Sequence, residues 1–322
     1  MPPSSGAERR QVLPLVLLAV VVFIWASNTI ISKLALQEAT PVLLALVRFS
    51  LAALCFHLPV FLITRRFGSP LRRGEWTRLA AAGMLGSGSS VLFFTIGVAT
   101  TPATYAGLIL MTAPIWTALL ARAFLGERLG LVRALGMGLA FVGAGVLATD
   151  GQLDTVDAGI VVGSGFLLLA QVCWGGYTLL SKPLLARRPP LLVLAVSHLL
   201  ALGALWPATL ALGAWAELPR VLTWSLPTWL AVLYMVVFVT GLSQAFYIYG
   251  LREVDASRAI SFMYLQPVFT AALAAIVLDE RPTPLTFACG GLILLGLWLV
   301  NRRQAQRPTP RAATAEPAVG RR

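Results

Sequence analysis

The chain contains two copies of one sequence pattern, and this internal duplication limits the folds that it can adopt. Its only two lysines, Lys33 and Lys182, stand 149 positions apart, near the ends of the similar stretches 25–34 and 174–183. Every other basic residue is arginine. Two lysines at matching places therefore indicate a repeated unit rather than scattered charges.

A second match supports the duplication. At an offset of 153, residues 111–118 align with 264–271, so that Pro114 falls on Pro267. At the same offset the stretch 125–128 falls on 278–281, which superimposes two Glu-Arg pairs.

Apolar runs of about 20 residues, each long enough to cross a bilayer, follow one another along the chain. Hydrophobic residues make up 58% and charged residues 12%, outside the range of soluble domains. The fold class is therefore an all-α polytopic membrane protein with ten transmembrane helices. We predict them at residues 12–31, 41–63, 79–98, 104–123, 131–149, 158–180, 190–213, 227–249, 259–278 and 284–301.

Ten helices in two copies give five in each, so the second copy must enter the membrane from the opposite side. The sequence thus predicts two inverted five-helix repeats, an arrangement that places a transport site near the bilayer midplane between the copies. The predicted segments are an N-terminal tail 1–11, a first repeat 12–149, an outer linker 150–157, a second repeat 158–301 and a disordered tail 302–322.

The net charge of +12 is distributed by side of the membrane. With the N-terminus inside, the predicted outer side and outer helix ends hold only four basic residues, namely Lys33, Arg48, Arg220 and Arg281. This bias follows the positive-inside rule and predicts that both termini are cytoplasmic. The basic charge therefore indicates contact with the lipid bilayer rather than with nucleic acid.

The chain resembles the ten-helix EamA-type permeases of the drug/metabolite transporter superfamily. The resemblance rests on the Trp-x-x-x-Thr-x-x-Ser-Lys motif at the ends of the first and sixth helices, on Pro114 and Pro267, and on the Glu-Arg turns after them. It covers about residues 12–301. It implies a bacterial inner-membrane permease, often an exporter of amino acids or other small metabolites.

We expect polar and aromatic side chains from both copies to line a substrate path. Asn and Gln at bilayer depth are costly unless they find partners, although bonding between helices is an equal alternative for Asn28, Gln171, Gln244 and Gln266. The predicted path residues are Trp25, Asn28, Thr29, Lys33, Arg48, Tyr105, Thr112, Gln171, Trp174, Tyr177, Lys182, Gln244, Tyr247, Tyr264 and Gln266.

Arg48 lies about seven residues inside the second predicted helix, too deep for an ordinary loop charge. Two interpretations stay open: the side chain extends outward to water, or it faces the cavity and holds a substrate carboxylate. Lys33 and Lys182 are predicted to lie at the outer and inner ends of the path.

Pro114 and Pro267 fall in the middle of predicted helices, where proline frees a backbone carbonyl. We predict cavity-lining, gating bends there; simple packing kinks are the alternative. The turns that follow carry paired charges, which we interpret as structural clamps rather than gates or proton sites. These residues are Glu127, Arg128, Glu280 and Arg281.

His57 and His198 stand alone in their predicted helices, and we expect polar packing residues rather than a proton relay. Small residues in the fifth and tenth predicted helices favour close packing within the chain, and a homodimer face stays open. No Asp or Glu falls in the middle of a predicted span, which disfavours exchange of protons for cationic drugs.

These observations predict a secondary transporter that exports a small metabolite, such as an amino acid or related zwitterion or anion, by alternating access. No metal spacing or catalytic pair is evident, so we expect no enzyme activity, no metal and no cofactor. A facilitated exchanger without proton coupling and a non-transporting scaffold or signalling protein are the alternatives.

Overall fold

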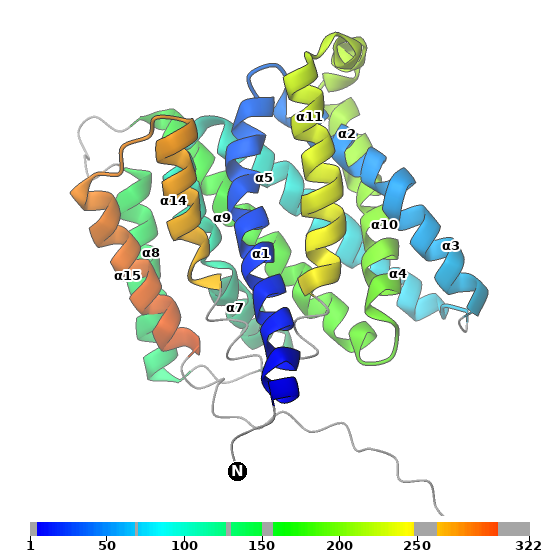
Figure 1. The fold of residues 1–322 in the computed structure, drawn as a ribbon, viewed down its shortest axis with the longest axis horizontal. Coiled ribbons are helices and arrows are strands. Elements are labelled where there is room, and N and C mark those ends of the chain that lie inside the picture. Colours follow the sequence, from blue (N-terminus) through cyan, green and yellow to red (C-terminus); the bar gives the residue numbers. More distant parts are fainter. Residues whose placement is uncertain (1–4, 68–69, 127–129, 150–156, 248–262, 302–322) are drawn as a thin grey trace, which may run out of the picture.

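The computed structural model describes residues 5–67, 70–126, 130–149, 157–247 and 263–301, and these residues form helices and turns without a strand (Figure 1). The first copy contains α1 (Ser5–Ala35), α2 (Pro41–Ala52), η1 (Ala53–His57), α3 (Leu58–Phe67), α4 (Arg73–Ala81), η2 (Ala82–Gly88), α5 (Ser89–Thr100), α6 (Ala103–Leu110), α7 (Ala113–Leu125) and α8 (Leu131–Ala148). The second contains α9 (Ala158–Leu185), α10 (Pro190–Ala211), η3 (Ala214–Thr223), α11 (Leu226–Tyr234), η4 (Met235–Leu242), α14 (Gln266–Val277) and α15 (Pro284–Asn301).

Among the described residues, seven helices are long and apolar enough to cross a membrane. Several are built from successive elements, as when α2, η1 and α3 join into one rod over Pro41–Arg66. Three shorter apolar helices, Leu131–Leu147, Gln266–Val277 and Pro284–Val300, occupy other predicted spans. The all-helical class is thus confirmed for the described residues, and the count of ten stays a prediction.

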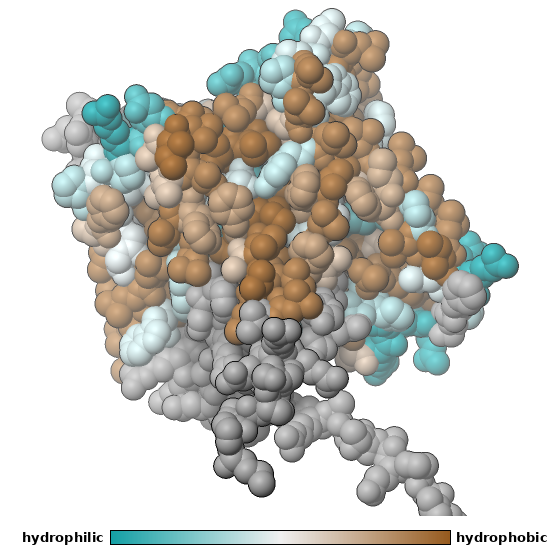
Figure 2. Space-filling model, in the orientation of Figure 1, coloured by the Kyte–Doolittle hydropathy of each residue, from teal (hydrophilic) through white to brown (hydrophobic). Residues whose placement is uncertain are grey.

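Hydrophobic side chains cover most of the visible surface between polar groups at its ends (Figure 2). Large apolar residues such as Leu222, Ile276 and Leu131 are more than 70% exposed. An apolar surface of this extent is suited to lipid rather than water.

Small residues allow α8 and α15 to pack closely on one side of the bundle (Figure 1). A Cβ atom on Gly143 would lie 2.9 Å from the carbonyl oxygen of Cys289, and one on Gly296 would lie 2.8 Å from the backbone nitrogen of Ala140. These glycines therefore serve contact within the chain, which was the first of the two predicted uses of the small-residue pattern.

The prolines begin helices in the structure instead of bending continuous ones. Pro114 lies in the first turn of α7 and Pro267 in the first turn of α14. In the first of these spans α6 has already ended at Leu110. Pro114 lies in the middle of the apolar span Ala103–Leu125, as predicted, but the helix is interrupted just before the proline rather than bent through it. A proline in a first turn removes no hydrogen bond that the new helix needs.

Three helical segments are π-wound: η1, η2 and η4. Segments of this kind often mark functional sites. Here η2 packs on α10 and α9, where a Cβ atom on Gly86 would lie 2.7 Å from the Cβ atom of Tyr177. The other two carry residues of the buried polar clusters described next.

Candidate functional site

Arg48 on α2 is buried inside the bundle, with 6% of its surface exposed. Its Nη1 donates to Oδ1 of Asn28 on α1 at 3.1 Å, and its Nε donates to Oγ1 of Thr240 on η4 at 3.1 Å. A longer contact of 3.9 Å joins Nη1 to the sulfur of Met235. The side chain therefore does not extend outward to water, which was one of the two interpretations of the sequence.

All three described partners of Arg48 are neutral, so they orient the guanidinium without cancelling its charge. No ion pair joins Arg48 to a carboxylate of the described segments. A buried charge is costly unless it is paired. Because a guanidinium presents donors in a planar fork that matches a carboxylate, this environment is suited to binding an anion.

Aromatic residues of α1 and the second copy meet close to this cluster. The indole Nε1 of Trp25 donates to Oγ of Ser243 at 3.0 Å, and its ring lies 5.2 Å from that of Tyr247. On α9, Trp174 and Tyr177 stack with ring centroids 5.2 Å apart. Three predicted path residues of helices one and six, Trp25, Trp174 and Tyr177, therefore contact aromatic partners.

His57 and His198 form a contact that the sequence did not predict. Because η1 packs against α10, Nε2 of His57 lies 3.1 Å from Nδ1 of His198, and both residues are 3% exposed. The Nε2 atom of His198 is buried and has no hydrogen-bond partner among the described residues. The expectation that each histidine stands alone is therefore wrong.

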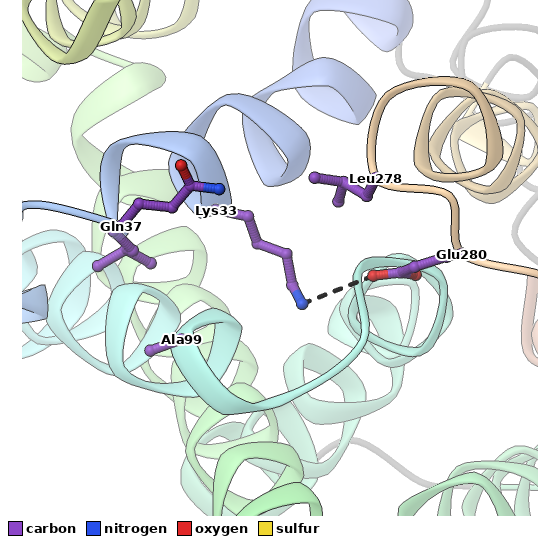
Figure 3. Close-up of a pocket in the computed structure, with 6 residues that line it drawn as sticks. Lys33, Gln37, Ala99, Leu278 and Glu280 are labelled. Carbon is purple, nitrogen blue, oxygen red and sulfur yellow. Dashed lines mark ion pairs between the residues drawn. The ribbon is translucent and has the colours of Figure 1, made fainter.

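The two ends of the bundle are called outer and inner after the predicted topology. At the outer end, Glu280 joins three parts of the chain (Figure 3). Its carboxylate accepts hydrogen bonds from the backbone nitrogens of Ala103 at 2.7 Å and Thr104 at 3.0 Å, and from the Thr104 hydroxyl at 3.0 Å. Its Oε1 also lies 3.5 Å from Nζ of Lys33. The ion pair lies in a cavity lined by Lys33, Leu36, Gln37, Ala99, Leu278 and Glu280.

This geometry corrects the role expected for the outer turn. Glu280 caps α6 of the first copy rather than the helix that follows it in sequence. Arg281 takes no part in that contact, since its side chain is 90% exposed and lies 3.9 Å from Asp279. A local clamp formed by Glu280 and Arg281 is therefore wrong, because the helix N-terminus of α6 supplies better donors.

The inner end has a different arrangement. Lys182 is exposed and makes no ion pair with a described residue. Arg188 binds Glu75 through two bonds of 2.9 and 2.7 Å, and these bonds raise the pKa of Arg188. Glu127 and Arg128, predicted to form the equivalent turn, lie outside the described residues.

The structure also places the remaining predicted path residues. Thr112 donates to the carbonyl of Ile109 in its own span, and Tyr105 lies in the apolar core between α6, α8 and α15. Gln171 and Thr29 are buried, whereas Gln244, Tyr264 and Gln266 are half-buried. Within the described residues, no hydrogen bond joins Thr29, Thr112 or any of the three glutamines to Arg48.

Sequence reasoning missed Met235 and Thr240 as partners of Arg48. They lie on η4 in the second copy, and neither residue type stands out in an apolar helix. The sequence did contain one signal. Arg48 lies deep in an apolar helix, and a charged side chain at that depth requires a partner on a neighbouring helix.

Together the apolar helices and the buried guanidinium of Arg48 indicate an integral membrane protein of the transporter class. The chain belongs to the EamA-like transporter family, whose pattern matches residues 12–149 and 161–302. The two matches correspond to the two copies in the sequence. Homologous transporters imply a small-molecule substrate.

The chain is similar to several curated transporters. It is 28% identical to an uncharacterized transporter of Archaeoglobus fulgidus, over 90% of this chain and 98% of that one. It is also 28% identical to a probable amino-acid metabolite efflux pump of Escherichia coli (88% and 93%). A probable terminal-alkyne amino-acid exporter of Streptantibioticus cattleyicolor is 28% identical as well (73% and 76%).

A crystal structure of another protein aligns with 91% of this chain and 99% of its own. The TM-score is 0.56 and the sequence identity 18%, which shows a shared fold.

Proposed function

We propose that the protein is a secondary transporter of the bacterial inner membrane that exports a small metabolite with a carboxylate group, such as an amino acid or a related anion. The observation that carries this proposal is the buried guanidinium of Arg48, held by neutral partners from both copies. The printed names of two relatives, an amino-acid metabolite efflux pump and an amino-acid exporter, support the same substrate class.

The substrate carboxylate binds Arg48 between α1, α2 and η4. Asn28 and Thr240 hold the guanidinium in place, so that the plane of its fork is set before the anion arrives. Trp25 and Tyr247 supply flat apolar surface for the rest of the substrate. The carboxylate then neutralises a charge that is otherwise unpaired in an apolar interior.

Transport follows from alternating access between two inverted repeats. The Lys33–Glu280 pair links α1, α6 and the end of α14, and it closes the outer end of the path in this conformation. Opening requires these bonds to separate. The helices that begin at Pro114 and Pro267 are the moving elements, and Lys182 serves the inner end.

Counterflow in proteoliposomes tests this function. Purified protein is reconstituted and assayed with pooled labelled amino acids and organic acids, beside Arg48→Gln, Arg48→Lys and the control Arg220→Gln. The Arg220 side chain is 74% exposed and pairs with Glu217 of its own helix η3, so its substitution should leave flux unchanged.

Wild-type protein should show saturable flux. Arg48→Gln should weaken apparent affinity at least about 30-fold, since truncating one partner of a buried charge pair costs about 2 kcal/mol or more. Arg48→Lys should retain only part of the activity because it loses the fork. Undiminished flux and unchanged affinity in a folded Arg48→Gln variant would rule out the carboxylate site.

A further inference from the structure

The buried His57–His198 contact has no part in the anion site, yet it lies next to it. Arg48 and His57 belong to the same rod, and Arg48 is close enough to act electrostatically on His198. The ring of Phe49, which follows Arg48 in sequence, lies 5.4 Å from the His198 ring. A change of charge on the histidine pair is therefore felt at Arg48.

The hydrogen bond between the two rings leaves one nitrogen of His198 free to bind a proton. When Nδ1–H of His198 donates to Nε2 of His57, Nε2 of His198 carries a lone pair that no described residue uses. A proton that binds there makes His198 an imidazolium and leaves the bond to His57 intact. That bond then becomes charge-assisted and stronger. In the opposite tautomer the unpaired Nε2 of His198 carries a hydrogen and cannot accept a proton.

We propose that His57 and His198 form a proton-binding site, with Nε2 of His198 as the atom that takes the proton and His57 as the acceptor that stabilises the charged ring. The site is coupled to Arg48. The coupling of this proton to substrate rests on the proposed function, because it requires a carboxylate to bind at Arg48.

The surroundings of the pair contain few other groups that could change charge. The ring of Tyr177 on α9 lies 6.3 Å from His198, and Arg48 on α2 acts on His198 electrostatically. Neither η2 nor α5, which also pack on α10, has a titratable residue. In η1, Cys55 is exposed. Charged residues on the other elements packed against α10 or η1 are Arg65 and Arg66 on α3, Arg73, Glu75 and Arg78 on α4, Lys182 on α9, and Glu217 and Arg220 on η3.

Electrostatics sets the sign of the coupling. A proton on His198 places a second positive charge beside Arg48, which is unfavourable. A carboxylate bound to Arg48 removes that repulsion, so the anion favours proton binding. By linkage the proton favours anion binding to the same extent. Proton and carboxylate therefore bind the protein cooperatively.

The chain contains only two histidines, so isotope-labelled histidine reports on this pair alone. Protein purified with a histidine-free tag is placed in lipid nanodiscs, and the ring ¹⁵N signals are followed by NMR as pH is lowered. The wild type, Arg48→Gln and His57→Gln are compared. Acetate serves as the carboxylate probe and chloride as the control anion.

We expect one proton to bind the wild-type pair, with its main effect on Nε2 of His198. Arg48→Gln should raise the midpoint of this titration by about one pH unit, the low end of the effect of a nearby charge. Acetate should raise it in the wild type and chloride should not. In His57→Gln the His198 ring should take up its proton at a lower pH than in the wild type.

A ring pair that takes up no proton between pH 4 and 9, in any variant and with either anion, would overturn the proton site. A midpoint that Arg48→Gln leaves unchanged would overturn the coupling. A midpoint that responds to Arg48→Gln but not to acetate would support the proton site and count against the carboxylate site of the proposed function.

Discussion

Replacing Glu280 by glutamine tests whether the outer contact holds the path closed. Gln retains an oxygen that can accept one backbone bond of α6, but it loses the charge that faces both the helix N-terminus and Lys33. The bonds at stake are those of 2.7 and 3.0 Å to Ala103 and Thr104 and the 3.5 Å ion pair.

The structure sets the size of the effect. Loss of a helix cap costs about 0.5–2 kcal/mol, and a charge at a helix N-terminus contributes about 0.3–1 kcal/mol. The ion pair adds up to about 1 kcal/mol, because both side chains are only about one-fifth exposed, at 22% and 19%. Since Gln keeps part of the cap, we expect Glu280→Gln to weaken the closed state by about 1.5–2 kcal/mol. A difference of 1.4 kcal/mol is tenfold in an equilibrium, so the open population should rise about 10- to 30-fold.

Accessibility of a buried cysteine measures this population. Ser32 stands beside Lys33 on α1, is fully buried and donates to the sulfur of Met235 at 3.4 Å. A Ser32→Cys reporter, in a background without the three native cysteines, should react with a membrane-impermeant maleimide only when the outer end opens. Glu280→Gln should speed this labelling about tenfold or more.

Asp279→Asn is the matched control, because Asp279 is 87% exposed on the same turn and makes no bond to α6 in the structure. It should leave the labelling rate unchanged. If Glu280→Gln lowers the melting temperature without faster labelling, the contact stabilises the fold and is not broken on opening. That result would refute the gate.

Two further predictions concern packing and pH. Gly296→Val should destabilise the protein by about 1–3 kcal/mol through overpacking against Ala140. Gly291→Val is the control, because a Cβ atom at Gly291 would have no neighbouring atom within 4 Å. Equal melting temperatures of the two variants would contradict this prediction. Hydrogen bonding from the side chain of Ser225, and the 2.8 Å bond from its backbone nitrogen, lower the pKa of Glu38 below 4.5. The stability from this bond is present above 4.5 and lost as pH falls through the lowered value, so Glu38→Gln should flatten the melting temperature only in that acid range. A wild type and a Glu38→Gln variant with parallel pH profiles would show that the bond contributes nothing.

The sequence predicted the helical class because apolar runs of bilayer length leave little choice of structure. The sequence also predicted correctly the helix starts that are marked by proline, as at Pro41 and Pro190. The sequence did not predict the π-wound segments, because their winding depends on the packing of neighbouring helices rather than on local propensity. Those segments carry His57, Met235 and Thr240. The sequence therefore predicted only part of each of the two polar clusters.

Contacts between distant segments explain the other differences. Glu280 was predicted to act within its own turn, since sequence shows only neighbours along the chain. In the structure it reaches α6, about 177 positions away, because α14 packs beside α6 and brings the end of its span to that N-terminus. Arg48 was recognised as unusual from its depth alone, but its partners required the packing of η4 against both α1 and α2.

The residues of the two polar clusters depart from the symmetry of the duplication. At the offset of 149 that aligns Lys33 with Lys182, Arg48 falls on Ser197 and Phe49 falls on His198. A faithful repeat would have carried a second arginine in place of Ser197, and two such buried cations near each other would repel. Divergence of the copies instead leaves one guanidinium and one histidine pair where α2 meets α10. The repeated residues thus identify the family, whereas the unrepeated ones are where we expect substrate and proton to bind.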